Sequence, residues 1–329
     1  MTPTFDSVLV VSFGGPQGLA DIRPFLANVL RGRRVSPERV EEVARHYEQF
    51  GGVSPITALT VRQAAGLADG LRTAGHPLPV HVGMRNWHPY LAETLRQMQQ
   101  DGLRHAVGFI AAAQHSYSSC QQYRENVAAA QAEVRADLGD APAVTFTGSW
   151  FDHPGFVAAN AAHVRTARAR LPAALQARAR LVCTAHSIPV SMAVRSRYEA
   201  QLRRSAALVA DATGMADWAL VYQSRSGRPG DPWLEPDIGD YLRSARAEGV
   251  EAVVVCPIGF VCDHIEVLYD LDQAAADVAR EIGLAMTRAD AVNDDPLFVD
   301  MMTDVVLTTV RRYATGRPLP LVAQPASPG

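Results

Sequence analysis

The sequence predicts an α/β fold in two similar halves, each with a parallel sheet flanked by helices. Short apolar runs rich in Val, Ile and Ala alternate with amphipathic segments of helical length, which is typical of parallel strands joined by crossover helices. The chain has 329 residues, enough for about two domains of ordinary size. The order of segments in the first half recurs in the second, which indicates a duplicated α/β unit.

The individual elements follow from their apolar patterns. Strands are predicted at 8–13, 80–84, 106–112, 144–147, 181–185, 219–222 and 252–258. Helices are predicted at 19–30, 37–49, 56–74, 90–101, 119–137, 154–170, 197–213, 237–248, 265–280 and 296–313. The clearest helix start is Ser36, because a serine N-cap followed by Pro37 and Glu38 suits a first turn. Ligands bind at the carboxyl ends of parallel strands, so the residues just after each strand are the candidates for a site.

Composition excludes several kinds of protein. All 31 basic residues are arginine, which excludes a lysine base, a lysine Schiff base and a phosphate-loop lysine. A net charge of −3 provides no overall basic field, so we expect no nucleic-acid partner. The longest apolar stretch, 252–262, is far shorter than the roughly 20 residues of a membrane span. Since the first residues also lack a basic signal segment, we expect a cytoplasmic protein with no transmembrane segment.

Four predicted strand ends carry unusual polar or glycine-rich sequence: "SFGGP" (12–16), "AAQHSYSSCQQY" (112–123), "CTAHSIP" (183–189) and "PIGFVCDHIE" (257–266). His186 follows directly after the apolar strand 181–185, at the edge of the sheet where ligands bind. The pattern allows either a structural or a functional histidine at this position. Glycines and prolines indicate two further ordered loops, "GGVSP" (51–55) and the segment 222–237. In the first of these loops, Ser54 is either structural or turned toward a ligand.

Glu266 begins an acidic row with Asp270, Gln273 and Asp277 at i, i+4, i+7 and i+11 of a predicted helix. This row is either functional or a solvated face, in which case Asp263 and Glu266 form a capping box. A histidine and a carboxylate on equivalent strand ends would together suit the handling of protons and a divalent metal. A structural zinc site needs four ligands, so we expect any metal here to be transient or to need donors from a substrate.

Nucleotide and cluster sites are disfavoured. Gly14 and Gly15 lack the G-x-G-x-x-G pattern, and Pro16 has no N–H to donate to a phosphate. Four cysteines, Cys120, Cys183, Cys256 and Cys262, include no C-x-x-C pair. Neither a disulfide scaffold nor a local zinc or iron–sulfur site is therefore indicated, and we expect four reduced thiols.

At these segments the sequence resembles the ferrochelatases, which insert ferrous iron into a porphyrin, and it looks nearest to the coproporphyrin ferrochelatases of Gram-positive, actinobacterial type. The resemblance covers residues 7–313 and rests on "SFGGP", "RHYEQFGGVSPI" (45–56), "CTAHSIP", "QSRSG" (223–227), "PWLEPDI" (232–238) and, most specifically, "GFVCDHIEVLYDLD" (259–272). It implies two Rossmann-like domains, 1–150 and 151–315, with the porphyrin in a cleft between them. The Pro-, Ala- and Gly-rich tail 316–329 is expected to be flexible.

The resemblance also implies roles for individual residues. His186 matches the active-site histidine of the family and Glu266 the carboxylate that faces it. Ser54 and Tyr123 match porphyrin-contacting positions. Phe13 stands where some relatives place a tyrosine that ligates the product iron, and His46 stands where several have an arginine near a propionate. Asp270 is a further candidate for metal, and Arg31, Arg33, Arg34 and Arg45 are candidates for cationic contacts near the mouth of the cleft.

The activity implied is insertion of Fe²⁺ into coproporphyrin III to form coproheme, with release of two pyrrole protons. His186 can act as base or ligand, and Glu266 can hold an exchanging cation. Iron is then a substrate, no cofactor is permanently bound, and no iron–sulfur cluster is expected because no cysteine follows Cys262. Three alternatives stay open: a protoporphyrin IX ferrochelatase, a cobalt or nickel tetrapyrrole chelatase, and a non-enzymatic porphyrin carrier. Transient contacts with neighbouring enzymes of haem synthesis are also expected.

Overall fold

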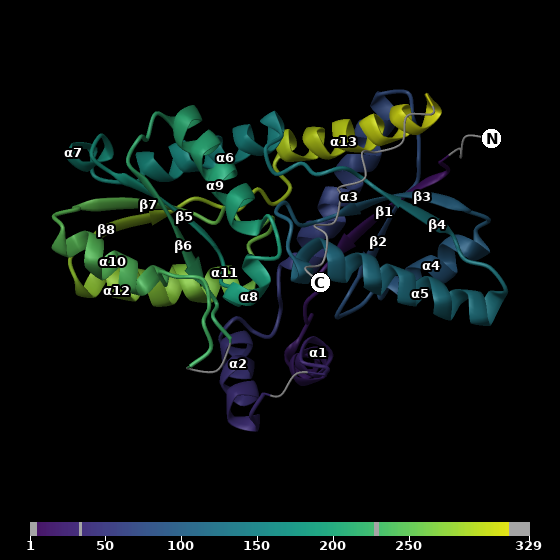
Figure 1. Cartoon of the computed structure of the whole chain (residues 1–329), viewed down its shortest axis with the longest axis horizontal. Coiled ribbons are helices and arrows are strands. Elements are labelled where there is room, and N and C mark those ends of the chain that lie inside the picture. The colour runs from purple at the N-terminus through teal and green to yellow at the C-terminus, as the bar shows by residue number, and fades with distance from the viewer. Residues whose placement is uncertain (1–4, 33–34, 227–229, 316–329) are drawn as a thin grey trace, which may run out of the picture.

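A computed structural model of the chain describes residues 5–32, 35–226 and 230–315. The predicted tail 316–329 lies outside these residues, as do Arg33 and Arg34. The described chain forms two parallel four-stranded sheets with helices on both faces of each (Figure 1). No described helix is both long enough and apolar enough to span a membrane.

Both sheets have the same strand order, as expected for a duplicated unit. The first has the order β2-β1-β3-β4 and the second β6-β5-β7-β8. Their strands are β1 (Ser7–Ser12), β2 (Val80–Met84), β3 (His105–Ile110), β4 (Ala143–Phe146), β5 (Arg180–His186), β6 (Trp218–Gln223), β7 (Ala252–Cys256) and β8 (Ala285–Arg288). The predicted fold class and the seven predicted strands are confirmed. The eighth, β8, was missed because it is a half-buried edge strand with a mixed sequence, AMTR.

The helices that cover the sheets are α3 (Ile56–Thr73), α4 (Leu91–Gln100), α5 (Gln122–Leu138), α6 (Pro154–Ala169), α9 (Tyr198–Thr213), α10 (Ile238–Ala247), α12 (Ala276–Glu281) and α13 (Pro296–Ala314). In β1, alternate side chains enter different cores because successive residues of a strand point to opposite faces. Val8 and Val10 pack with α3 and α13, whereas Leu9 and Val11 pack with α4 and α5. Both faces of the strand are thus covered, which explains its continuous apolar run.

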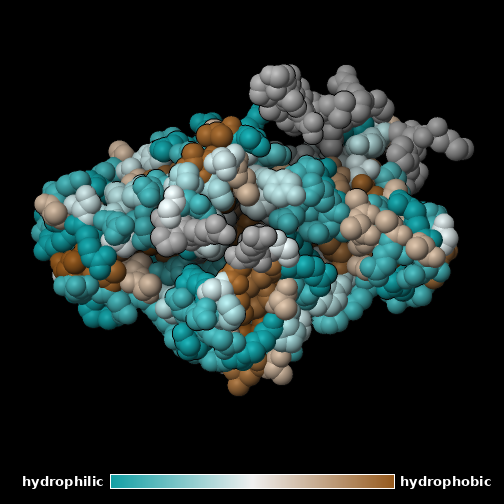
Figure 2. Space-filling view, turned by 60° about the horizontal axis from the view of Figure 1, so that its bottom comes forward, coloured by the Kyte–Doolittle hydropathy of each residue, from teal (hydrophilic) through white to brown (hydrophobic). Residues whose placement is uncertain are grey.

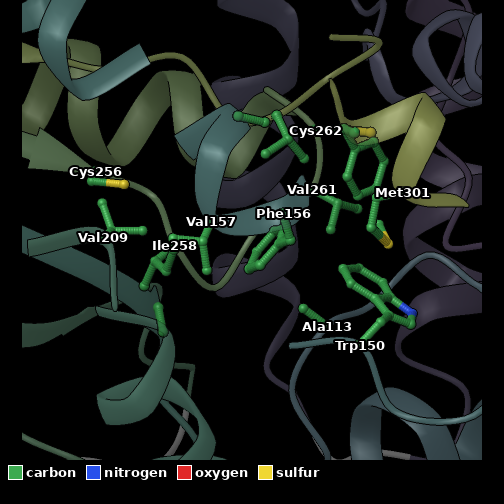
Figure 3. Close-up of a cluster of buried hydrophobic side chains, with 14 of the residues drawn as sticks. Ala113, Trp150, Phe156, Val157, Val209, Cys256, Ile258, Val261, Cys262 and Met301 are labelled. Carbon is green, nitrogen blue, oxygen red and sulfur yellow. The ribbon is translucent and has the colours of Figure 1, made fainter. Parts of the chain in front are cut away.

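The apolar core is continuous between the two halves. Trp150, in the segment between the sheets, stacks on Phe109 of β3 with ring centroids 5.3 Å apart. It also contacts Phe156 of α6 at 5.4 Å and Phe298 of α13 at 5.7 Å. Figure 3 shows Trp150 and Phe156 in this core. The last helix of the predicted second domain, α13, therefore returns to pack on α3 and β3 of the first half (Figure 1).

Two further helices, α1 (Ile22–Val29) and α2 (Pro37–Gln49), project together from the side of the molecule at the junction of the halves (Figure 1). The predicted start of α2 is confirmed, because Ser36 Oγ accepts a hydrogen bond from the N–H of Arg39 at 3.3 Å. Figure 2, turned to bring this side forward, shows apolar side chains gathered near the middle of the face and bordered by hydrophilic ones.

The predicted helix 265–280 is divided into three segments. A short helix, α11 (Ile265–Val267), leads into a π-helix, η3 (Leu268–Ala275), and then into α12. Because a π-turn contains more residues than an α-turn, the predicted acidic row does not stay on one face. Asp270 is turned inward, but Asp277 is exposed and pairs with Arg280 at 2.7 Å. The row predicted from α-helical spacing is thus wrong beyond Asp270.

Smaller elements complete the described chain: α7 (Ala173–Gln176), α8 (Val190–Ala193), a 3₁₀ turn η1 (Leu19–Asp21) and a second π-helix η2 (Tyr117–Gln121).

Candidate active site

The ends of the neighbouring strands β5 and β7 bring His186 and Glu266 together. The chain after β7 lies directly on β5, where Gly259 N–H donates to the Thr184 carbonyl at 3.0 Å. A Cβ atom at position 259 would lie 2.5 Å from Ala185 Cβ, so only glycine allows this approach. The loop then turns into α11, which begins one residue before Glu266.

His186 Nε2 lies 3.7 Å from Glu266 Oε2, and the two side chains are 35% and 37% exposed. The other ring nitrogen, Nδ1, faces the Ser187 carbonyl oxygen, which accepts and cannot donate. Nδ1 therefore carries the hydrogen in the neutral imidazole, and the lone pair of Nε2 faces Glu266. Tyr198 OH donates to the His186 carbonyl at 3.0 Å and fixes the strand end. This pair presents an accessible base and a carboxylate to the same space.

Asp270, one turn beyond Glu266, adds a second carboxylate. Its Oδ2 accepts hydrogen bonds from Ser224 Oγ and, at 3.4 Å, from Gln223 Nε2 at the end of β6. Ser224 has φ +61, a left-handed conformation that directs the loop after β6. Burial raises the pKa of Asp270 to about 6, helped by the charge of Glu266 and opposed by the Ser224 hydrogen bond. Asp270 can therefore exchange a proton close to neutral pH.

The capping-box alternative for Asp263 and Glu266 is wrong. Asp263 instead accepts from Arg288 Nη1 at 2.7 Å and Asn293 Nδ2 at 2.6 Å. The N-cap of α11 is His264, whose Nδ1 accepts from the Glu266 N–H at 3.2 Å. The Glu266 carboxylate is thus not used in capping and faces His186.

The first half provides an aromatic and cationic wall. Arg85 lies near Phe13, at the end of β1, and Tyr123, on α5, with its Cζ 5.8 Å and 5.9 Å from the two ring centroids. Burial raises the pKa of Tyr123, and the charge of Glu266 contributes to the same shift. Tyr47 of α2 shows the same two effects on its pKa. The charge of Glu266, from the second half, thus acts on tyrosines of the first half.

Arg85 was missed in the sequence. It follows the predicted strand 80–84 directly, so the rule that sites lie just after strands would have found it.

Three of the remaining predicted residues lie on or beside α2. Ser54 is almost fully buried and packs against Gly15, since a Cβ atom at position 15 would lie 2.5 Å from Ser54 Cβ. The Ser54 N–H donates to the Pro16 carbonyl at 2.8 Å. Arg45 is exposed. The His46 ring stacks on Tyr269 of η3, with centroids 3.6 Å apart and planes 15° from parallel. Burial lowers the pKa of His46, which favours a neutral imidazole in this stack.

The cysteines are a further class of residue that commonly binds metals. Cys183, Cys256 and Cys262 are buried free thiols, and Cys120 is half-buried and free. In the part of the chain that the structure describes, no three His, Cys, Asp or Glu side chains converge as a set of metal ligands.

Comparison with known proteins identifies the family. The family Ferrochelatase matches residues 6–310. The chain belongs to the ferrochelatase family. It is 50% identical to a ferrochelatase of Rhodopirellula baltica over 92% of this chain and 86% of that protein. It is 47% identical to a coproporphyrin III ferrochelatase of Nocardia farcinica over 92% of this chain and 87% of that one.

Solved structures agree with the ferrochelatase fold. SirB from Bacillus subtilis with Fe³⁺ has a TM-score of 0.58 and 8% identity, over 95% of this chain and 98% of that one. The sirohydrochlorin chelatase SirB from Bacillus subtilis subspecies spizizenii, in complex with cobalt, has a TM-score of 0.55 and 9% identity, over 94% and 97% of the two chains. At these identities the likeness shows the two-domain fold alone. The family match and the curated relatives confirm the resemblance of the sequence motifs to ferrochelatases.

Proposed function

We propose that this ferrochelatase inserts Fe²⁺ into coproporphyrin III, with His186 and Glu266 as the groups that handle metal and protons. The observation that carries the proposal is the approach of His186 Nε2 to within 3.7 Å of Glu266 Oε2, with both side chains partly exposed. A base and an anionic ligand at one point suit the exchange of two protons for one divalent ion.

The proposed reaction balances without a redox step. Two pyrrole N–H bonds break and Fe²⁺ forms bonds to all four ring nitrogens, so that the ring loses two protons as it gains the divalent ion. The lone pair of His186 Nε2 accepts the two protons one after the other and releases the first toward Asp270 and water before it takes the second. Glu266 holds the iron while the water ligands of the ion are replaced by the ring nitrogens. Asp270 is the group we assign to pass a proton onward, because its pKa of about 6 lies near neutrality.

Two observations support coproporphyrin as the substrate. Several relatives at 44–47% identity are named coproporphyrin III ferrochelatases, including those of Nocardia farcinica and Mycolicibacterium smegmatis. Coproporphyrin carries four propionates, and the first half offers the exposed arginines Arg31, just after α1, and Arg45, on α2, together with Arg85 near Phe13. Guanidinium groups bind carboxylates through charge-assisted hydrogen bonds. We further propose that the enzyme has no resident cofactor or iron–sulfur cluster, acts in the cytoplasm and meets neighbouring haem-pathway enzymes only transiently.

The test is anaerobic turnover with Fe²⁺ and either coproporphyrin III or protoporphyrin IX, followed by loss of the free-base spectrum. We expect preferential use of coproporphyrin and a loss of roughly 10²–10⁴-fold in His186→Ala and Glu266→Gln. Asp277→Asn, which changes an exposed acid on the same stretch of helix, is the matched control and should keep wild-type activity.

Each other result has a defined meaning. Preference for protoporphyrin would reject the substrate assignment but keep the site. Turnover that survives His186→Ala would reject the roles given to the pair, and stoichiometric binding without turnover would favour a carrier. Faster insertion of cobalt or nickel than of iron would reject iron as the metal.

A further inference from the structure

The segment that carries Glu266 has two faces with different partners. Ile265, Leu268 and Tyr269, at i, i+3 and i+4, turn toward α1 and α2. Glu266 and Asp270, also spaced by four residues, turn toward His186 and Ser224. One short stretch of helix therefore connects the projecting helices of the first half with the metal-handling groups of the second.

The contact with α1 and α2 is tight on the apolar face. Ile265 is 2% exposed and belongs to a cluster that otherwise comes from α1 and α2, with Leu268 packed against it; the other buried members are Ile22, Phe25, Leu26, Ala44 and Tyr47. The His46–Tyr269 stack lies at the edge of this cluster and pairs a ring of α2 with a ring of η3. The apolar cluster provides adhesion, while a stack of two planar rings also fixes their relative orientation.

The α1–α2 pair is in turn anchored beside the predicted porphyrin contacts. Its two ends meet where Ser54 N–H donates to the Pro16 carbonyl and Gln17 Nε2 donates to the Ser54 carbonyl at 3.4 Å. Arg45 precedes His46 on the same helix. A porphyrin bound against α2 would therefore act on the same unit that His46 connects to Tyr269.

We propose that His46 and Tyr269 form a positioning pair that couples α2 to the helix turn of Glu266 and so sets the approach of Glu266 to His186 during iron insertion. This inference rests on the proposed function of His186 and Glu266. Neither ring touches the reacting atoms in this role. The pair acts through Glu266, which lies three residues before Tyr269, and through Asp270, which follows it.

Three variants test the pair, with a matched control elsewhere in the fold. Tyr269→Leu and His46→Ala remove the stack, and Tyr269→Phe keeps a ring without the hydroxyl. Tyr313→Leu removes a partly buried aromatic ring that contacts Phe5 at 5.4 Å, on α13 and away from the site. All four are compared in the full-length protein by steady-state kinetics, porphyrin fluorescence quenching and thermal unfolding.

We expect Tyr269→Leu and His46→Ala each to raise the KM for Fe²⁺ and lower kcat, for a combined loss of roughly tenfold in kcat/KM. Coproporphyrin affinity should change less than twofold in Tyr269→Leu, which leaves the predicted porphyrin contacts intact. Tyr269→Phe should restore wild-type kinetics, and Tyr313→Leu should lower the unfolding temperature without changing either KM. An unchanged KM for Fe²⁺ in Tyr269→Leu, with activity lost only in proportion to unfolded protein, would reduce the stack to a structural contact and overturn the proposal. Failure of Tyr269→Phe to rescue would also overturn it.

A titration of the porphyrin-free protein with Fe²⁺ alone, under anaerobic conditions, separates this inference from the proposed function. Weaker Fe²⁺ binding in Tyr269→Leu than in Tyr313→Leu would support the positioning pair. Failure of the wild-type protein to metalate porphyrin would reject the proposed function but would leave that support in place. Equal Fe²⁺ binding in the two variants, alongside normal wild-type turnover, would reject the positioning pair and keep the function.

Discussion

Asp263 and Arg288 form a nearly buried ion pair, with 2.7 Å between Oδ1 and Nη1 and side chains 14% and 12% exposed. Arg288 belongs to β8, the strand that sequence patterns did not predict, and Asp263 lies three residues before Glu266. The pair therefore ties an edge strand to the loop that presents the Glu266 carboxylate. Arg288 also binds Asp272 of η3, so its guanidinium holds both ends of the Glu266 segment.

Removing Arg288 should destabilise the fold strongly. Arg288→Met leaves the Asp263 carboxylate with little access to water and without its cation, and loss of one partner of a buried pair costs about 3 kcal/mol. We expect a decrease of this size in the free energy of unfolding, measured in urea. The control is Arg280→Met, whose exposed pair with Asp277 should contribute less than about 1 kcal/mol. Equal effects of the two substitutions would contradict the importance of the buried pair.

The raised pKa of Asp270 predicts a pH dependence of stability. The native state holds this proton with a pKa of about 6, against 3.8 ordinarily, so it binds the proton more tightly than the unfolded chain. The free energy of unfolding then falls as pH rises from about 4 to 6, and the contribution is absent above that range. In Asp270→Asn we expect the stability gained between pH 8 and pH 5 to be smaller than in wild type by about 1 kcal/mol.

Urea unfolding at pH 5 and pH 8 measures this difference. Asp277→Asn should retain the wild-type pH dependence because Asp277 is exposed. If the free energy of unfolding of Asp270→Asn changed with pH as much as that of the wild type, a group other than Asp270 would be responsible for the pH dependence.

Arg85 should contribute to porphyrin binding. Its guanidinium carbon lies 5.8 Å and 5.9 Å from the ring centroids of Phe13 and Tyr123, two of the predicted porphyrin contacts. Arg85→Met should raise the KM for coproporphyrin about tenfold, because one charge-assisted contact with a carboxylate is worth about 1.5 kcal/mol. The KM for Fe²⁺ should change little. Arg85→Lys should recover part of the affinity, and a loss confined to kcat would assign Arg85 to the chemical step instead.

Phe13→Tyr should change how the product is held. Phe13 has no oxygen, whereas a tyrosine at this end of β1 would place a phenol beside Arg85, whose charge favours the phenolate. We expect tighter retention of the iron product and a shifted visible spectrum of the complex. Rapid mixing with apo-protein, followed by product transfer, measures the retention. A spectrum identical to wild type would place the iron out of reach of position 13.

Much of the fold was predictable from local sequence. The continuous apolar runs of β1, β5 and β7 follow from strands covered on both faces, and the start of α2 follows from the side-chain chemistry of Ser36 and Pro37. The ends of neighbouring parallel strands marked His186, and the loop that leads to Glu266, as candidates, but left both side chains as either structural or functional. Their family motifs pointed to the same two residues.

The failures share a physical cause. The α-helical spacing placed Asp277 with Glu266, but packing of Ile265 and Leu268 against α1–α2 accompanies a π-helix whose turn is wider. The local pattern also favoured a capping box at Asp263, because its real partner, Arg288, is distant in sequence.

The sequence alone therefore determined the fold class and most elements, because strand burial and helix capping depend on neighbouring residues. Its motifs also proposed His186 and Glu266 as site residues through their resemblance to the family. Only the tertiary structure decided the wall formed by Arg85, the inward turn of Asp270 and the stacking of His46 on Tyr269. These arrangements join segments from both halves, and no local pattern of apolar or polar residues encodes contacts between elements that meet only when both sheets have formed.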